Sequence, residues 1–247
     1  MDEGKSTVRA VDRALDILLC FTIRTDWAMT EIAEHVGLHK STVHRMLATL
    51  EEKGFIERDH DTDRYHLGLK IWELSANLSR TDDQATIWLP EMVRLRDALG
   101  ETVSIYVRDG SERIRIQAVQ SNEPIRRVAP VGARLPLYAG ASSKVLIAFA
   151  DPQIQALVMD DPMFQANISI EQYKEQLKEL VAQGYATSVE ERESGVAAIS
   201  APIFDRTGKL VAALSVSGPA SRLTLERMKE YSAVMIESAK RMGTMMK

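Results

Sequence analysis

Apolar positions in the N-terminal part of the chain recur with the spacing of short amphipathic helices. In the first helix they lie three or four residues apart, and the helix is expected to end near Phe21. Thr30 is placed to cap a short second helix, and Gly37 stands where a helix-ending residue belongs. The apolar stripes are Val8, Val11, Leu15, Leu18 and Leu19 in the first helix, and Ile32, Ala33 and Val36 in the second.

A third helix and a hairpin complete the pattern of this region. Val43, Met46, Leu47 and Leu50 follow the i, i+3, i+4, i+7 spacing of a helix that Gly54 ends. Two helices joined by a Gly-containing turn form a helix-turn-helix. Residues 55–58 and 64–67 are β-prone and flank the polar residues 59–63, so they predict a hairpin that serves as a wing.

The stretch after the hairpin predicts a connection between two domains. Leu69, Trp72, Leu74 and Leu78 indicate a helix from Gly68 to about Arg80, and the polar residues 79–84 are the expected linker. The predicted organisation is a winged helix-turn-helix domain at 1–67, a connecting helix and linker at 68–83, and a second domain at 84–247.

The second domain mixes helices and strands without strict alternation. Val103, Ile105 and Val107 alternate with polar residues, residues 109–110 form a turn, and Ile114, Ile116 and Ala118 alternate back. Residues 131–140 form a loop that opens a helix through Phe149. The other predicted helices cover residues 84–99, 170–182 and 224–242, and the other strands cover 196–204 and 210–217. The fold class predicted here is an α+β domain with a mostly antiparallel sheet.

Composition narrows the class of protein. The 247 residues are 45% hydrophobic and 27% charged, which is ordinary for a globular protein with a real core. The single cysteine, Cys20, lies in an apolar run, so a buried thiol and a reducing cytoplasm are expected. No apolar run approaches the roughly 18 residues that span a bilayer, and the start does not resemble a secretory signal. A cytoplasmic protein with no membrane partner is therefore predicted.

The charge balance speaks against a non-specific polyanion binder. The net charge is -4, so binding of nucleic acid must rest on a local arrangement of charge. Such an arrangement exists, because no Asp or Glu occurs from Val36 to Leu50.

The polar face of the third helix is a candidate DNA reader. The N-terminal turns of a helix in the major groove meet the base edges, while Lys40 and the helix N-terminus can hold phosphate. The alternative is a solvated amphipathic helix. The candidate DNA-binding residues are Thr30, Lys40, Ser41, Thr42, His44 and Arg45, with Arg58, Arg64 and His66 on the wing.

Several of these segments resemble the IclR-type bacterial transcription regulators. In the first domain the resemblance rests on TEIA at 30–33, GL at 37–38, KSTVHR at 40–45 and YHLG at 65–68. In the second it rests on AGASSK at 139–144, GYA at 184–186, APIFD at 201–205 and AALSVSGP at 212–219. The resemblance runs in order over about residues 8 to 242.

The resemblance implies that the second domain binds a small effector, an organic acid or an aromatic metabolite. The first N–H groups of the helix after Gly140 would face an anion, and Ser215 and Ser217 point to one face of a strand. Ser188 and Ala198 stand where some members have an acidic residue and a cysteine. For each serine a solvent-facing or capping role is the alternative, and for Leu135 and Tyr138 it is core packing. The candidate effector-binding residues are Leu135, Tyr138, Gly140, Ala141, Ser142, Ser143, Ser188, Ala198, Ser215 and Ser217.

The family resemblance also implies the partners. It indicates a homodimer or dimer of dimers that binds a pseudo-palindromic double-stranded DNA operator and represses genes for metabolism or transport of the effector. Whether it represses or activates stays open from the residues alone.

Two other classes of protein are disfavoured. A metal-dependent regulator would use the five His residues, but Gly37 separates His35 from His39, and no CxxC or HExxH pattern occurs. An enzyme using the second domain would lack a His base, since no His follows His66. No cofactor and no metal site are expected.

Overall fold

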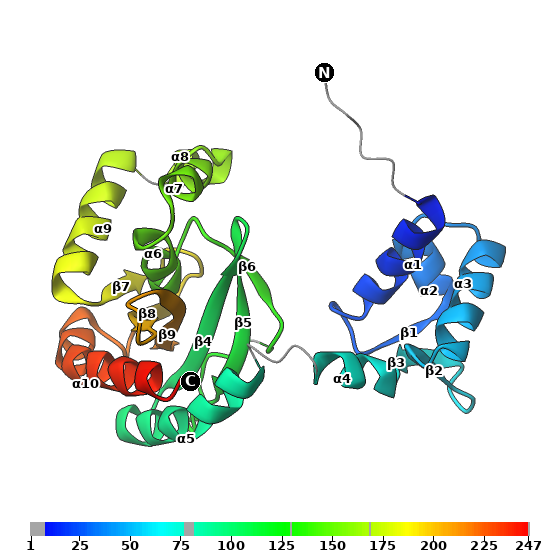
Figure 1. Cartoon of the computed structure of the whole chain (residues 1–247), viewed down its shortest axis with the longest axis horizontal. Helices are drawn as coiled ribbons and strands as arrows, with labels where there is room; N and C mark the ends of the chain where they lie inside the picture. Colours follow the sequence, from blue (N-terminus) through cyan, green and yellow to red (C-terminus); the bar gives the residue numbers. More distant parts are fainter. Residues whose placement is uncertain (1–7, 77–81, 129, 168, 247) are drawn as a thin grey trace. The chain divides into compact units, whose positions relative to one another are not determined.

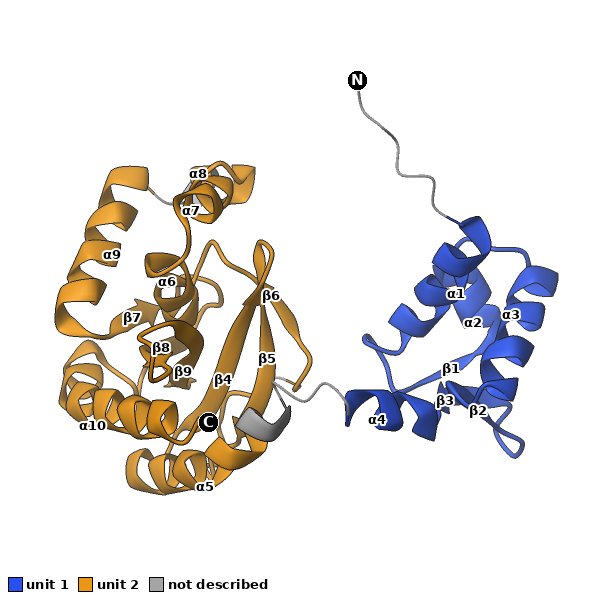
Figure 2. Cartoon of the chain, viewed as in Figure 1, with its two compact units in different colours: residues 1–82 blue, residues 83–247 orange. Residues whose placement is uncertain are grey.

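A computed structural model describes residues 8–76, 82–128, 130–167 and 169–246 of the chain. The chain divides into two compact units, Met1–Asp82 and Asp83–Lys247 (Figure 2). Each unit has its own buried core and is described separately.

The first unit is a helix-turn-helix followed by a small antiparallel sheet (Figure 1). Gly37, with φ of 64°, supplies the left-handed conformation that ends the second helix. The strands follow the order β1-β3-β2, which confirms the predicted hairpin as β2 and β3. The elements are α1 Arg9–Cys20, β1 Asp26–Ala28, α2 Met29–His35, α3 Lys40–Glu52, β2 Ile56–Asp59, β3 Arg64–Leu67 and α4 Leu69–Ser75.

Packing inside this unit fixes the third helix. Val43 and Leu47 of α3 are completely buried, as are Ile17 of α1 and Ile32 of α2. The Trp27 indole of β1 donates a 3.0 Å hydrogen bond to the carbonyl oxygen of Cys20, so the short strand is tied to the end of α1. One face of α3 is thereby held in the core and the other is left at the surface.

Three predictions for the first unit are wrong in detail. The second helix begins at Met29 with Ala28 as its N-cap, so Thr30 lies inside the first turn; the Glu31 carboxylate accepts from the Ala28 N–H at 2.9 Å instead. Residues 24–29 predict a loop between the first two helices, but Asp26–Ala28 form β1, because they pair with the distant β3.

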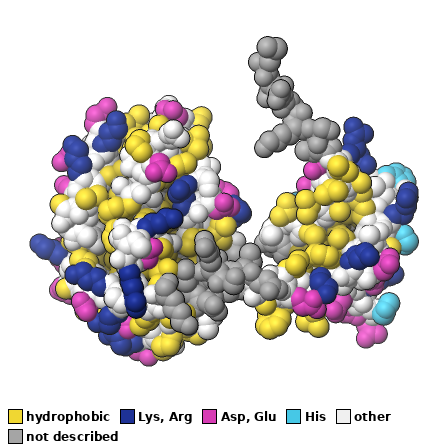
Figure 3. Space-filling model, viewed as in Figure 1, with side chains coloured by type: hydrophobic (Ala, Val, Ile, Leu, Met, Phe, Trp, Pro, Cys, Tyr) yellow, Lys and Arg dark blue, Asp and Glu magenta, His cyan; other side chains and the backbone are white. Residues whose placement is uncertain are grey.

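The third correction concerns the first helix, which exists but turns a different face to the core. Ile17 and Cys20 are buried, whereas most of the predicted apolar stripe is exposed. Figure 3 shows the resulting apolar surface over α1. The exposed residues are Val8, Val11, Leu15 and Leu19.

The predicted connection is described in part. The helix expected from Gly68 to about Arg80 is observed as α4, which ends at Ser75. Residues 77–81, where the linker prediction begins, lie outside the described residues, and α5 starts at Asp82.

The second unit is a six-stranded antiparallel sheet with helices on both faces (Figure 1). The strand order is β6-β5-β4-β9-β8-β7, which confirms the predicted fold class. The sequence did not indicate α7, α8, β6 or β7. The elements are α5 Asp82–Leu99, β4 Thr102–Asp109, β5 Glu112–Val119, β6 Arg134–Pro136, α6 Ala141–Ala148, α7 Pro152–Met159, α8 Pro162–Asn167, α9 Ile170–Gln183, β7 Ala186–Val189, β8 Val196–Phe204, β9 Leu210–Pro219 and α10 Leu225–Thr244.

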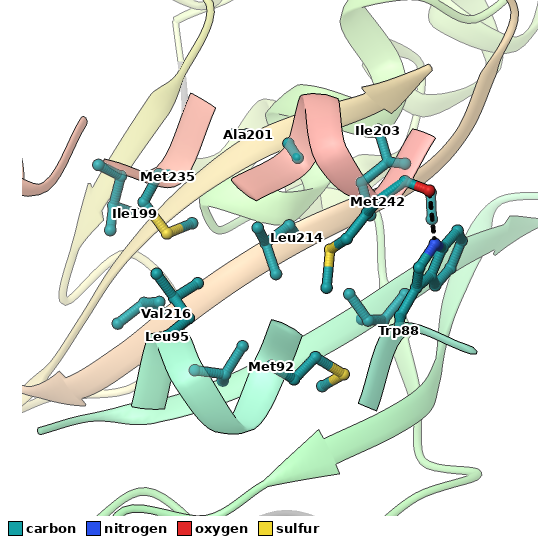
Figure 4. Close-up of a cluster of buried hydrophobic side chains, with 14 of the residues drawn as sticks. Trp88, Met92, Leu95, Ile199, Ala201, Ile203, Leu214, Val216, Met235 and Met242 are labelled. Atoms are coloured by element: carbon teal, nitrogen blue, oxygen red, sulfur yellow. Dashed lines mark hydrogen bonds between the residues drawn. The ribbon is translucent and has the colours of Figure 1, made fainter. Parts of the chain in front are cut away.

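The main core lies between the sheet and the helices α5 and α10. Alternate residues of β8 and β9, such as Ile199 and Leu214, meet Met92 of α5 and Met235 of α10 (Figure 4). The buried Trp88 indole donates a 2.9 Å hydrogen bond to the Met242 carbonyl, which joins the two helices. On the opposite face, α6 and α9 cover the sheet with a second apolar cluster. The residues of β8 and β9 that alternate with these core residues therefore point to the opposite face of the sheet, towards α6.

A buried ionic cluster also joins α5 to α10. Glu91 is 7% exposed and accepts hydrogen bonds from Arg94 on its own helix, at 2.6 and 2.9 Å, and from Arg241 of α10 at 2.8 and 3.1 Å. Burial by itself raises the pKa of Glu91, but the hydrogen bonds from Arg94, Arg241 and Ser238 outweigh it and lower this pKa to about 2.

Glu91→Gln tests this cluster through acid stability. Because the folded pKa is depressed, the stabilisation is present above about pH 4.5 and is lost as the pH falls towards 2. As the pH falls through that window, the free energy of unfolding of the wild type should therefore drop by on the order of 3 kcal/mol more than that of the variant. Scanning calorimetry between pH 2.5 and pH 7 measures the difference. Glu175→Gln, which removes an exposed ion pair with Lys178, is the control and should follow the wild type. Parallel acid profiles for wild type and Glu91→Gln would contradict the assignment.

Candidate functional site

From Lys40 to Leu50 the exposed face of α3 carries cations and no acid. Lys40, Ser41, His44 and Arg45 are exposed and Thr42 is half-buried. The side chains of Lys40, His44 and Arg45 make no hydrogen bond or ion pair with any residue that the structure describes. These groups are therefore free to contact an anionic partner.

The start of α3 is capped from outside the helix. The Nδ1 atom of His39 accepts from the Ser41 N–H at 3.3 Å and lies 2.8 Å from the Ser41 hydroxyl. The first turn contains no acidic residue, so the positive end of the helix dipole is not neutralised. Thr30 is exposed on the first turn of α2.

The wing differs from α3, because each of its candidate cations is already paired with an acid. Arg58 pairs with Asp63. Arg64 pairs with Asp26 of β1 and, at 2.8 Å, with Glu31 of α2. The Nε2 atom of His66 lies 3.6 Å from the Glu57 carboxylate. Arg64 thus joins β3 to β1 and α2, which is a structural position rather than a free phosphate contact.

In the second unit, polar side chains line up across the strands on the face towards α6. Ser215 of β9 lies between Ser104 of β4 and Ser200 of β8, since it pairs with both. Two residues further along β9, on the same face of the sheet, Ser217 pairs with Ala198 of β8. Ala198 in turn pairs with Ser188 of β7. The register therefore brings residues from separate segments into one patch.

A cavity of about 50 Å³ lies over this patch and under the start of α6. Eight of the ten predicted effector-binding residues line it: Leu135, Gly140, Ala141, Ser142, Ser188, Ala198, Ser215 and Ser217. The Ser143 hydroxyl instead donates to the carbonyl oxygens of Ala139 at 2.9 Å and Pro136 at 3.3 Å. Tyr138 packs against the apolar cluster of α6 and α9. Neither of these two residues lines the cavity.

The cavity is also lined by three arginines that the sequence patterns did not indicate: Arg113, Arg127 and Arg192. The alternation of β5 pointed to Ile114 and Ile116 as the inward residues. In the structure Arg113 and Arg115 are the buried ones, because both faces of the sheet are covered. Arg115 lies beneath the cavity, where its Nε donates to the Ser104 hydroxyl at 3.0 Å.

Arg113 is the most buried of the three arginines that line the cavity, at 3% exposure. One terminal nitrogen donates to the carbonyl oxygens of Pro136 and Ala139 at 2.8 and 2.9 Å, and its Nε has no partner. A Cβ at position 140 would lie only 3.2 Å from the other terminal nitrogen of Arg113. The φ of Gly140 is 103°, which other residues rarely adopt, so both the space and the backbone conformation favour glycine here. Burial, with a smaller contribution from the nearby Arg192, lowers the pKa of Arg113 to about 10, although Tyr106, Tyr173 and Glu191 act in the opposite direction. The guanidinium is still charged at neutral pH.

The loop 190–195 brings acids to the edge of the cavity. Glu191 pairs with Lys144 of α6 and accepts from the Gly140 N–H at 3.1 Å. Glu193 pairs with Arg127 at 2.9 Å and with Arg192 at 3.2 Å. The lining residues thus include three arginines and one glutamate, an excess of two positive charges.

A larger groove, about 770 Å³, lies between α7 and α9. Its floor is made of apolar residues such as Met159 and Leu177, and its charged residues, Asp160, Lys174 and Lys178, lie at the surface. No buried cation or unpartnered buried polar atom lines it among the described residues. The smaller cavity is therefore the better candidate for a specific ligand.

The described parts of the chain hold no group of three or more His, Cys, Asp or Glu side chains that could bind a metal ion. His35 packs against Trp27, with ring centroids 5.2 Å apart, and His39 caps α3. Of the helices that the structure describes, none has the length and hydrophobicity needed to cross a membrane.

Comparison with known proteins places both units in one family. Residues 10–60 match the family described as "IclR helix-turn-helix domain", and residues 78–244 match "Bacterial transcriptional regulator IclR C-terminal". The HTH-type transcriptional regulator BhcR of Paracoccus denitrificans is 32% identical over 98% of this chain and 88% of its own. The transcriptional repressor IclR of Escherichia coli is 31% identical over 86% of this chain and 80% of its own. The crystal structure of the Thermotoga maritima IclR matches with a TM-score of 0.74 at 30% identity, covering 96% of this chain and 99% of that one. The chain belongs to the IclR family of bacterial transcription regulators, which bind DNA through the first unit and respond to a small molecule through the second.

Proposed function

We propose that this regulator represses genes for the metabolism or transport of a small organic acid, and that this acid is its effector. The supporting relatives include proteins described as repressors, IclR and AllR of Escherichia coli. The single observation that carries the effector proposal is the buried Arg113, which has an unused N–H in a cavity lined by serines.

The reader of the operator is α3. Its exposed Lys40, Ser41, Thr42, His44 and Arg45 meet the base edges and flanking phosphates, with Arg45 as the base contact and Lys40 as a phosphate contact. Thr30 contacts the backbone from α2. The wing residues Arg58, Arg64 and His66 contribute less, because acids on the same domain already neutralise them.

The regulator acts as a homo-oligomer on a pseudo-palindromic operator. Support comes from the exposed apolar residues of α1, Val8, Val11, Leu15 and Leu19, which suit a surface covered by a second copy. Two-fold symmetry of the protein would be matched by two half-sites in the DNA.

The effector is aliphatic and small. A cavity of about 50 Å³ has room for roughly four water-sized groups, far less than the ~300–1,000 Å³ of pockets for drug-sized ligands. An IclR homologue of Microbacterium hydrocarbonoxydans, 24% identical, is described as complexed with 4-hydroxybenzoate. A ring of that size does not fit this cavity as it stands, so we favour a short organic acid over an aromatic one.

The effector acts by population shift. It binds one conformation of the second unit more tightly than another, and the affinity for DNA follows that equilibrium.

Arg45→Ala tests the reader helix. Loss of a base contact should lower affinity for the operator by about 1–3 kcal/mol and relax preference at one base position, while non-specific binding weakens much less. A mobility-shift titration at fixed salt measures both quantities. The matched variant is Arg58→Ala on the wing, whose guanidinium is already paired with Asp63 and whose loss should matter less. If Arg45→Ala binds the operator as tightly as wild type, or if Arg58→Ala costs more, the assignment of α3 as the reader fails.

Combined Ser215→Ala and Ser217→Ala test the effector site. The variant should lose about 1–3 kcal/mol of affinity for the acid that binds the wild type, since two hydrogen-bonding groups are removed. Its operator affinity without effector should stay at the wild-type value. A thermal-shift screen of short organic acids identifies the ligand, and calorimetric titration measures the loss. Unchanged affinity for the acid would mean that the serines are structural.

A further inference from the structure

The arginines that line the cavity fall into two groups, a buried Arg113 and the more exposed Arg127 and Arg192, and each group could bind one anionic group. The deep position is formed by Arg113, Ser142 and the first turn of α6. The first hydrogen bond of that helix runs from Lys144 N to Gly140 O, so the N–H groups of residues 141–143 precede the intrahelical ladder. A buried cation is costly unless an anion or hydrogen bonds compensate it, and the Nε of Arg113 is still unused.

The outer position is formed by Arg127 and Arg192. Its occupant in this structure is a carboxylate of the protein itself, that of Glu193. The two arginine side chains are 18% and 26% exposed and the Glu193 side chain is 44% exposed. Glu193 is the most exposed of the three side chains, and a carboxylate from another molecule in its place would form the same ion pairs with Arg127 and Arg192, so the exchange conserves these contacts.

The charges around the cavity favour a dianion over a monoanion. Once Glu193 is displaced, the lining has three arginines, so a dianion compensates two positive charges and a monoanion compensates only one. Glu191 does not alter this balance, because it is paired with Lys144.

We propose that the effector is a short aliphatic dianion, with one acid group bound at Arg113 and the other bound at Arg127 and Arg192 in place of Glu193. This inference rests on the proposed function, since it gives the charge of the same organic-acid effector. Glu193 is then an internal competitor, which occupies the outer position until the second acid group of the ligand displaces it. The cavity accommodates the deep acid group and a short chain, and the second acid group takes the place that the Glu193 carboxylate leaves, so acids of about two to four carbons are the size to test.

Chain-matched pairs of acids provide the test. Malonate is compared with propionate, and succinate with butyrate, by calorimetric titration of the full chain. The diacid should bind at least about tenfold more tightly than its monoacid partner, as expected for one additional charge-assisted contact. Methyl phosphate, a dianion with both charges on one group, should bind no better than the monoacids if two separate positions are required.

Two variants locate the second acid group. Arg127→Gln should lower the affinity for the diacid by about tenfold and leave the monoacid nearly unchanged. Arg126→Gln is the matched control: it removes the same charge from the next residue, which is exposed and does not line the cavity. Glu193→Gln should raise the affinity for the diacid severalfold, because the competing carboxylate is gone.

The possible failures are distinct. If diacid and monoacid bind alike to the wild type, the effector site stands and the dianion is wrong. If Arg126→Gln and Arg127→Gln weaken the diacid equally, or Glu193→Gln does not strengthen it, the exchange at the outer position is wrong. If none of these acids binds at all, the organic-acid effector of the proposed function fails as well.

Discussion

The antiparallel pairing of β4 with β9 in the middle of the sheet is the constraint on which the second unit depends. Successive side chains of a strand point to opposite faces, so Leu214 and Val216 enter the core below α5 and α10 while Ser215 and Ser217 face the cavity. A slip of one residue would exchange these two sets, bury hydroxyls among apolar side chains and remove the polar groups from the cavity. The same register that stabilises the core therefore also builds the ligand site.

Positive charge is concentrated at particular sites in a chain whose net charge is -4. In the first unit, the reader helix is free of acids over its first turns, whereas Arg58 and Arg64 of the wing are neutralised by acids nearby. In the second unit, the positive charge of Arg113 is buried, where it acts on a ligand with little screening. Two anion-binding surfaces can thus exist on an acidic protein without a general affinity for polyanions.

Sequence patterns correctly predicted the features of the fold that depend on residues close together in the chain. The spacing of Val43 and Leu47 predicts α3 and its free face, and the alternation around Ser215 and Ser217 places both serines on one face. Sequence patterns could not predict features that depend on contacts between distant parts of the chain. β1 exists only because Trp27 pairs with Tyr65, and the burial of Arg113 depends on α6 and the 136–140 loop closing over β5. The apolar stripe of α1 has the right period, but no described residue of the first unit covers most of it.

The loop between β7 and β8 would give the cavity a means of responding to the proposed ligand. Glu190 adopts a positive φ and accepts from the Gly195 N–H at 2.6 Å, and Glu191 pairs with Lys144 of α6. These two carboxylates fix the loop to itself and to the helix. The carboxylate of Glu193, the third, forms ion pairs with Arg127 and Arg192, which also line the cavity. A ligand that takes those arginines changes the contacts of one loop residue and leaves its two anchors in place. A conformational response can be no larger than the difference in ligand affinity between the two states, so this exchangeable contact is where such a difference can arise.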